Sequence, residues 1–284
     1  MSGLLGRIIP QEVLNEGVAR VRSALAQPTA GRTPLISGLH GSTPSLLLAA
    51  WFAADRRTAL LVAPNRESAL RLADDLEAWL GPDDVIYLPP QEVPAFDRNA
   101  PDPELVGGVI HGLDRLARGE KALVVTSLYG ARHRGIAPER LAGQALGLTA
   151  GSRIDRVTLG ERMTAMGYQG VGAVGRTGDF AVRGSLVDVA APGGPPVRIE
   201  FFDDEIVSLR SFSVSDQRST GAVETLRLLP VSHLIVDDDG VLEALGCLEE
   251  AEAEGLIDGD DHVDLEARIE ERIHGGGIES FLPL

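Results

Sequence analysis

The stretch GDFAVRGSLVDVAAPGGPPVRIEFFDDEIVSLRSFSVSDQRS, residues 178–219, decides the fold of the middle of the chain. In FAVRGSLVDVA (180–190) and VRIEFF (197–202), apolar and polar side chains alternate with a period of two, which is typical of half-buried strands. Asp203–Asp204 separates VRIEFF from EIVSLRSFSV (205–214) and stands where a two-residue hairpin turn belongs. The stretch therefore predicts an antiparallel, β-rich unit that forms its own small domain.

The sequence before this unit follows a different pattern. Over residues 1–130, amphipathic helical segments alternate with short apolar runs that are rich in β-branched residues. The predicted helices are 12–26, 44–53, 66–80 (capped by Asn65) and 103–119, and the predicted extended runs are 34–38, 58–64, 85–89 and 122–130. Such an alternation favours a largely parallel sheet covered by helices.

The predicted organisation therefore has three parts. Residues 1–135 form the first part of an α/β domain, and residues 136–225 form the β-rich domain. Residues 226–284 begin with LRLLPVSHLIV (226–236), which is interpreted as a strand that returns to the first domain, and continue as an acidic helical segment. The apolar end GGGIESFLPL favours a fragment of a longer protein.

PLISGLHGSTPSLLLAAWFA (34–53) has the layout of a phosphate-binding loop, an apolar run followed by a Gly-bearing turn and a helix. A template G-x-x-x-x-G-K-[ST] that starts at Gly38 places Thr43 at the second glycine and Pro44 at the lysine. Ser45 keeps the final hydroxyl, and Gly41 lies inside the loop. Without the lysine the β- and γ-phosphates lose a charge-assisted contact of about 1.5–3 kcal/mol. A helix start with Thr43 as N-cap and Pro44 at the first helical position fits better, so the loop is predicted not to bind nucleotide.

Charge is distributed unevenly along the chain. The formal net charge is −16, from 26 basic and 42 acidic residues. Residues 237–284 hold 16 of the acidic residues but only two arginines, so the remainder is close to neutral. Neither part has the basic stripe that a phosphate backbone requires, which disfavours direct DNA binding. The acidic block is interpreted as a solvated helical face.

Composition excludes several other classes. A single cysteine, Cys247, rules out an internal disulfide, and the six histidines lack metal-ligand spacing, so no metal site is expected. No run of about 18 apolar residues predicts a membrane span, and the first ten residues have too short an apolar core for a signal peptide. These features together predict a cytoplasmic location.

With these motifs in view, the chain resembles the N-terminal, UvrB-homologous module of the bacterial transcription-repair coupling factors, the Mfd family. The resemblance is strongest over 165–235, where residues 178–219 match the family signature nearly throughout, and diffuse over 1–130. LLPVSHLIV (228–236) resembles the family's return strand, and IESFLPL (278–284) its G-I-E-x-[FY]-L-P segment. QEVPAFDRNAPDPE (91–104) is too short and too poor in aromatic residues for the DNA-clamping hairpin of UvrB, which favours the coupling factors.

The resemblance implies a helicase-like α/β domain with a degenerate nucleotide loop, into which the β-rich domain and a helical segment are inserted. It implies a non-catalytic platform that recruits UvrA for nucleotide excision repair, without a cofactor of its own. The parent protein would be an ATP-driven translocase that acts on double-stranded DNA and displaces stalled RNA polymerase, with ATP and Mg²⁺ bound only in its motor domains. A C-terminal domain of the parent would mask the UvrA-docking surface.

Carried over by motif, the resemblance implies that Arg183, Arg198, Glu200 and Phe201 form the UvrA-docking surface. Period two places Arg198 and Glu200 on one face of a strand and Phe201 on the other, so Phe201 would need a bulge to take part. The chain departs from the family pattern at Gln169 and Ala181, positions where an arginine is found in relatives, and Arg176 is a candidate to replace that charge. Without the resemblance, isolated arginines on strands are usually solvated or paired within the chain.

Two other functions are compatible with the sequence. One is a nucleotide-binding, UvrB-like protein that acts on damaged DNA, which saturable ATP binding would support. The other is a freestanding paralogue that ends naturally at Leu284 and competes for UvrA.

Overall fold

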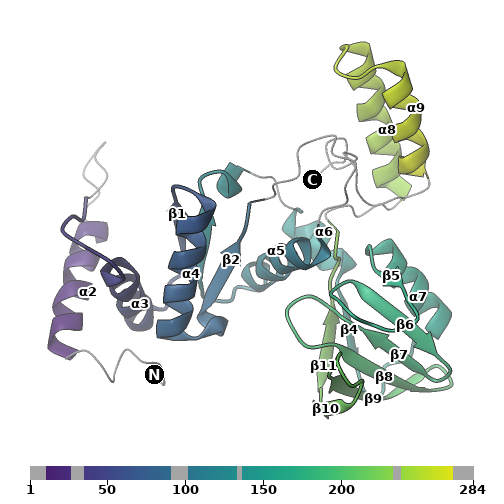
Figure 1. Ribbon diagram of the computed structural model, residues 1–284, viewed down its shortest axis with the longest axis horizontal. Helices are drawn as coiled ribbons and strands as arrows, with labels where there is room; N and C mark the ends of the chain where they lie inside the picture. The colour runs from purple at the N-terminus through teal and green to yellow at the C-terminus, as the bar shows by residue number, and fades with distance from the viewer. Residues whose placement is uncertain (1–10, 27–34, 91–101, 133–135, 233–237, 271–284) are drawn as a thin grey trace. The chain divides into compact units, whose positions relative to one another are not determined.

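A computed structural model describes residues 11–26, 35–90, 102–132, 136–232 and 238–270 (Figure 1). The chain forms two compact units, 1–90 with 115–133, and 91–114 with 134–284. The division falls within helix α5 (Pro103–Ala117), of which residues 103–114 belong to the second unit and the last turn to the first. The fold is mixed α/β, as the sequence predicts, with one parallel sheet and β-rich structure in the second unit.

The first unit is built from helices and short parallel strands. Its described elements are α2 (Gln11–Ala26), α3 (Thr43–Asp55), β1 (Ala59–Ala63), α4 (Arg66–Leu80), η1 (Pro82–Asp84), β2 (Val85–Leu88), β3 (Leu123–Ser127) and η2 (Gly130–Arg132). The strands form a parallel sheet in the order β1-β3-β2. Ala69, Ala73 and Leu76 of α4 pack against Val85, Leu123 and Val125 on one face of this sheet.

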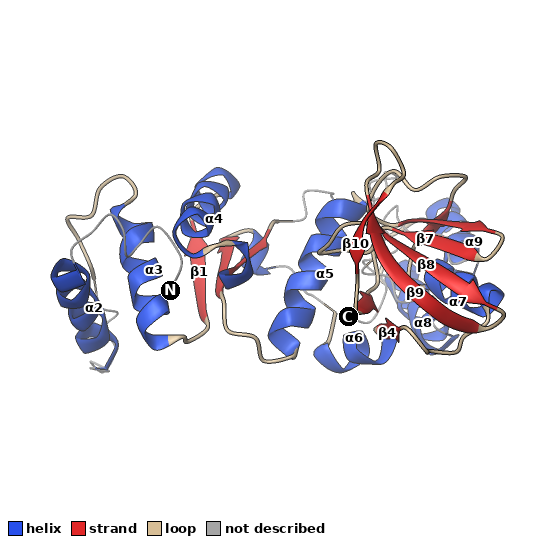
Figure 2. Cartoon of the chain, turned by 90° about the horizontal axis from the view of Figure 1, so that it is seen from below, coloured by secondary structure: helices blue, strands red, loops and turns tan. Residues whose placement is uncertain are grey.

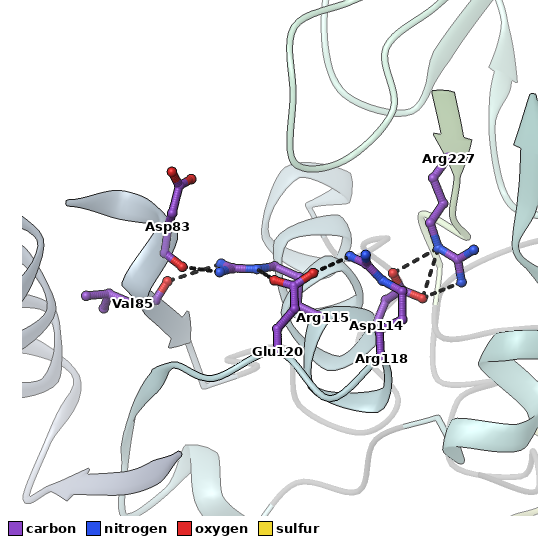
Figure 3. Close-up of polar contacts among 7 residues, drawn as sticks. All are labelled: Asp83, Val85, Asp114, Arg115, Arg118, Glu120 and Arg227. Carbon is purple, nitrogen blue, oxygen red and sulfur yellow. Dashed lines mark hydrogen bonds and ion pairs between the residues drawn. The ribbon is translucent and has the colours of Figure 1, made fainter. Parts of the chain in front are cut away.

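Local signals set the bounds of these elements. Asn65 caps α4 as predicted, because its side chain accepts a hydrogen bond from the Ser68 backbone N–H at 2.9 Å. The last turn of α5 is fixed to the sheet through Arg115, which donates to the carbonyl oxygens of Asp83 and Val85 and to Glu120 at 2.8 Å (Figure 3). The start of α4 and the end of α5 are therefore each held by polar contacts as well as by apolar packing.

The predicted strand 34–38 is wrong in its described part. Residues 35–38 have no regular secondary structure, and the side chain of Leu35 is 89% exposed. A strand needs a neighbour for its backbone hydrogen bonds, and among the described residues no strand pairs with this run. A short apolar run was therefore not enough to form a strand here.

The second unit holds the β-rich part. Its described elements, besides α5, are α6 (Pro138–Gln144), β4 (Leu146–Thr149), α7 (Arg156–Ala165), β5 (Gln169–Gly170), β6 (Asp179–Arg183), β7 (Leu186–Val189), β8 (Val197–Phe202), β9 (Glu205–Phe212), β10 (Ser219–Ala222), β11 (Thr225–Leu228), α8 (Asp238–Ala253) and α9 (Gly259–Glu270). Two sheets occur among them, one of six strands and one of two.

The larger sheet has the order β10-β9-β8-β7-β6-β5, and its strands β6 to β10 pair antiparallel. Figure 2 shows β7, β8 and β9 side by side. The predicted hairpin at Asp203–Asp204 is confirmed, with Asp203 in the left-handed region at φ 58°, which aspartate tolerates. Leu159 and Met163 of α7 pack against Val187 and Ile199 on one face of the sheet.

The smaller sheet pairs β11 with β4, both in the second unit. The described part of the predicted return strand 226–236 therefore pairs with β4, while residues 233–236 lie outside the described residues. The strand also contacts α5, which the prediction placed in the first domain, because the Arg227 guanidinium donates to the buried Asp114 carboxylate at 2.7 and 2.9 Å (Figure 3). This pair ties α5 to β11.

The acidic segment forms two packed helices. Ala244, Leu248 and Ala251 of α8 pack against Leu265 and Ile269 of α9, and Figure 1 shows the two helices side by side. Their described acidic side chains are solvent-exposed, which agrees with the interpretation as a solvated helical face. The segment 278–284, which resembles a family motif, and the QEVPAFDRNAP region (91–101) lie outside the described residues.

Candidate protein-interaction surface

Strand register brings three of the predicted docking residues onto one face of the six-stranded sheet. This face, opposite the one that packs against α7, is here called the arginine face. Two rows of cross-strand neighbours run over it, Arg183–Leu186–Glu200–Ser208 and Ala181–Asp188–Arg198–Arg210. Residues paired in this way project on the same side of a sheet with Cβ atoms about 4.5–5.5 Å apart. The predicted residues Arg183, Arg198 and Glu200 therefore share one surface.

Arg198 is held in place by contacts within the domain. Its Nε and Nη2 donate to the two carboxylate oxygens of Asp188 at 2.7 and 2.8 Å, and Nη1 donates to the Gln217 carbonyl at 3.2 Å. The guanidinium lies 4.9 Å from the centroid of the Phe212 ring. Its side chain is 20% exposed and that of Asp188 only 2%. The hydrogen bonds to Asp188 raise the pKa of the Arg198 guanidinium above its ordinary value.

The other charged groups on the arginine face are more accessible. Arg183, at the end of β6, and Arg210, on β9, are both exposed. Glu200 is half-buried and accepts a hydrogen bond from the Ser208 hydroxyl at 2.9 Å. Arg210 is the cross-strand neighbour of Arg198, and the sequence analysis did not select it, because strand register is needed to bring residues twelve positions apart together. The arginine face thus has two exposed guanidinium groups, those of Arg183 and Arg210, beside the guanidinium of Arg198, which is paired with Asp188.

Arg176 lies in the loop before β6 rather than on a strand. Its Nη2 lies 3.4 Å from the Gln169 side-chain oxygen, and its Nε lies 3.8 Å from the Asp179 carboxylate. Asp179 also accepts the backbone N–H groups of Gly175 and Arg176 at 2.9 and 3.0 Å, which shapes this loop. The side chain of Arg176 remains 64% exposed. It therefore remains a candidate contact, and Gln169, one of the two positions at which the sequence departs from the expected family pattern, is one of its neighbours.

Phe201 does not belong to the surface, which corrects the prediction. It is 4% exposed and packs in the core beneath the sheet, together with Val187 and Ile206. A bulge occurs between Glu200 and Phe201, but its extra residue lies on β9, so β8 keeps its alternation. The next residue, Phe202, therefore projects on the side of Arg198 and Glu200 and is 77% exposed. The period-two pattern held the signal for Phe202, which the sequence analysis overlooked.

The loop predicted not to bind nucleotide precedes α3. Gly38 and Gly41 have φ of 82° and 58°, a region that favours glycine. The N-cap of α3 is Ser42, one residue before the predicted Thr43, so Pro44 lies at the second helical position rather than the predicted first. The Ser45 hydroxyl is buried and shares its single proton between two acceptors, the Ser42 carbonyl at 2.8 Å and the Asp75 carboxylate at 3.1 Å. The group that would bind magnesium in an active loop is thus engaged within the protein.

With this geometry in place, comparison with known families identifies the domain that carries the arginine face. Residues 146–234 match the UvrB interaction domain. The matched range contains β4 to β11 with α7, and therefore the whole of the arginine face. The resemblance inferred from the sequence is confirmed for this domain.

The longer comparisons give the same result. The chain is 31% identical to the transcription-repair-coupling factor of Myxococcus xanthus over 267 residues, which is 89% of this chain and 22% of that protein. It is 28% identical to the one of Staphylococcus epidermidis and 29% identical to one of Staphylococcus aureus, each over 205 residues, or 72% of this chain and 18% of the relative. The chain therefore belongs to the transcription-repair-coupling factor family. It spans about a fifth of the length of the curated relatives it matches.

Within the described ranges, no cluster of three or more His, Cys, Asp or Glu side chains could hold a metal ion. None of the described helices is both long and apolar enough to cross a membrane.

Proposed function

We propose that this chain is the module through which a transcription-repair coupling factor recruits UvrA to damaged DNA, and that the arginine face is the docking surface. The observation that carries the proposal is the match of residues 146–234 to the UvrB interaction domain, because that range holds Arg183, Arg198 and Phe202 on one face. Exposed arginine and aromatic side chains are the residue types enriched at energetically dominant positions of protein interfaces.

The experiment is a calorimetric titration of UvrA from the same organism into the full chain. Arg183→Ala removes an exposed guanidinium from the arginine face, and we expect it to weaken binding about tenfold or more. The matched control is Arg162→Ala, which removes an exposed arginine from α7, on the opposite side of the sheet. Absence of binding by the wild-type chain, or equal weakening by the two variants, would contradict the proposed docking surface.

The α/β unit is proposed to have a helicase-like, P-loop-type fold whose nucleotide loop is inactive, so that the chain by itself is no enzyme and needs no cofactor. Pro44 in the place of the lysine, and the internal hydrogen bonds of Ser45, support this proposal. Titration with Mg–ATP tests it. Saturable binding below millimolar concentration would refute the inactive loop and favour a nucleotide-binding, UvrB-like protein instead.

The remaining activities are assigned to other parts of a longer parent protein. ATP-driven translocation on double-stranded DNA and displacement of RNA polymerase would reside there. The masking of the arginine face by a C-terminal domain would likewise come from the parent. These assignments rest on the similarity to the coupling factors, of which this chain covers about a fifth.

A further inference from the structure

The guanidinium of Arg198 has five N–H groups, and the domain uses three of them. Nε–H and one N–H of Nη2 bind Asp188, and one N–H of Nη1 binds the Gln217 carbonyl. One N–H therefore remains on each terminal nitrogen. The ring of Phe212 and the carboxylate of Asp188 hold the guanidinium plane, while the side chain keeps 20% of its surface exposed. Two donors are thus left without a partner among the described residues, on a guanidinium whose orientation is fixed and whose side chain is partly exposed.

The electrostatic state of this group differs from that of its neighbours. Asp188 is almost fully buried and contacts Arg198 through both of its oxygens, so the pair as a whole carries no net charge. Arg210 lies directly across from Arg198 and is exposed, and Arg183 is exposed at the end of β6. Like charges on opposite strand positions repel, so Asp188 also lets Arg198 and Arg210 occupy neighbouring positions.

We propose that the Arg198–Asp188 pair is a preorganised two-donor site that binds an amide carbonyl oxygen of the partner protein, whereas Arg183 and Arg210 attract its carboxylates. This inference rests on the proposed function, since it specifies the chemistry of the same docking surface. A neutral acceptor fits because the charge of Arg198 is already compensated, and a partner carboxylate placed there would lie close to the carboxylate of Asp188.

The two kinds of arginine then have different roles in binding. A guanidinium that is already ordered loses little side-chain entropy on association. Its hydrogen bonds to the partner act only at short range, after docking, so Arg198 mainly lowers the dissociation rate. Exposed, uncompensated charges act over longer distances and raise the association rate in a manner that salt suppresses. Arg183 and Arg210 therefore carry the salt dependence of the interaction.

The test measures association and dissociation rates of UvrA with the full chain at several salt concentrations. Arg198→Lys keeps the charge and a partner for Asp188 but removes the planar fork, and we expect dissociation at least tenfold faster with unchanged salt dependence. The matched change Arg210→Lys is expected to stay within twofold of wild type, and Arg210→Ala to slow association and flatten the salt dependence. Thermal unfolding of each variant confirms that the domain is folded.

Asp188→Asn distinguishes the two possible acceptors. This substitution keeps the shape of the buried side chain but frees the charge of Arg198, so a partner carboxylate would bind the variant more tightly. A partner amide carbonyl would bind it more weakly, because the fork is no longer held, and the salt dependence would become steeper. Tighter binding of Asp188→Asn, or an Arg198→Lys variant within twofold of wild type, overturns the inference while leaving the docking function intact. If the wild-type chain does not bind UvrA, the proposed function itself fails, and the inference fails with it.

Discussion

The ion pair between Asp114 and Arg227 gives the sharpest prediction about the stability of the second unit. The Asp114 side chain is 3% exposed, and Arg227 donates to both of its oxygens, whereas the Arg227 side chain is 36% exposed (Figure 3). The hydrogen bonds from Arg227 to Asp114 raise the pKa of the Arg227 guanidinium. Arg227→Ala would leave a buried carboxylate without this partner.

Removing one partner of a buried pair costs roughly 3–5 kcal/mol. Solvent reaches the arginine, so part of the interaction is screened, and we expect Arg227→Ala to destabilise the second unit by about 2–4 kcal/mol. For a unit of this size that corresponds to roughly 4–16 °C in Tm. Asp114→Leu/Arg227→Met, which replaces both partners by apolar side chains, should recover most of this loss.

Hydrogen exchange of the β7 and β8 amides as a function of urea measures this change, because these central strands exchange through global opening of the unit. Both tryptophans, Trp51 and Trp79, lie in the first unit, so tryptophan fluorescence reports separately whether that unit is folded. The control is Arg153→Ala, which removes an arginine with a 68% exposed side chain that pairs with surface carboxylates. It should change stability by less than about 0.5 kcal/mol.

A change of less than about 0.5 kcal/mol in Arg227→Ala would refute the reasoning, because a bidentate ion pair to a buried carboxylate would then contribute no more than an exposed pair. A loss of stability in Arg153→Ala as large as the loss in Arg227→Ala would refute it as well, since burial of the carboxylate would then not be the cause of the effect.

Three other predictions concern single positions. Phe201→Ala should lower the free energy of unfolding by about 3–5 kcal/mol. Phe202→Ala should leave the thermal unfolding curve unchanged and weaken UvrA binding about tenfold or more. A loss of stability in Phe202→Ala and a loss of binding alone in Phe201→Ala would contradict the orientation of β8. Gly193→Ala should destabilise by about 2–4 kcal/mol, because φ is 83° and a Cβ would lie 2.4 Å from the His111 ring, while Gly194→Ala, with open space around it, should be near neutral in the same urea titration. Hydrogen bonds from Arg22 of α2 lower the pKa of the Asp55 carboxyl below its ordinary value of 3.8. The pair therefore stabilises the first unit above that pH, and the stabilisation is lost as pH falls through the folded-state pKa. The difference in stability between wild type and Asp55→Asn, followed by tryptophan fluorescence, should close on acidification, and a difference that persists at low pH would argue against it.

Most local structure could be predicted from the sequence because its determinants are local. Helix α4 has the predicted bounds, since Asn65 caps it and one face is apolar. The β8–β9 hairpin follows from period-two alternation around a two-residue turn. The described part of the run 34–38 forms no strand, because a strand requires a pairing partner. The short helices α6 and α7 were not predicted, although Asp155 caps α7 by accepting the Val157 N–H.

By itself, the sequence determined that the middle of the chain is β-rich, that it resembles the UvrB-related family, and that Arg198 and Glu200 share one face of a strand. Only the tertiary structure decided the state of each charge on that face. Whether an arginine is compensated depends on which carboxylate the neighbouring strand places beside it. For Arg198 that carboxylate is Asp188, ten positions earlier, brought alongside by the β7–β8 register. The loop between β7 and β8 and the packing of the sheet against its core set this register, which the alternation within a single strand does not specify.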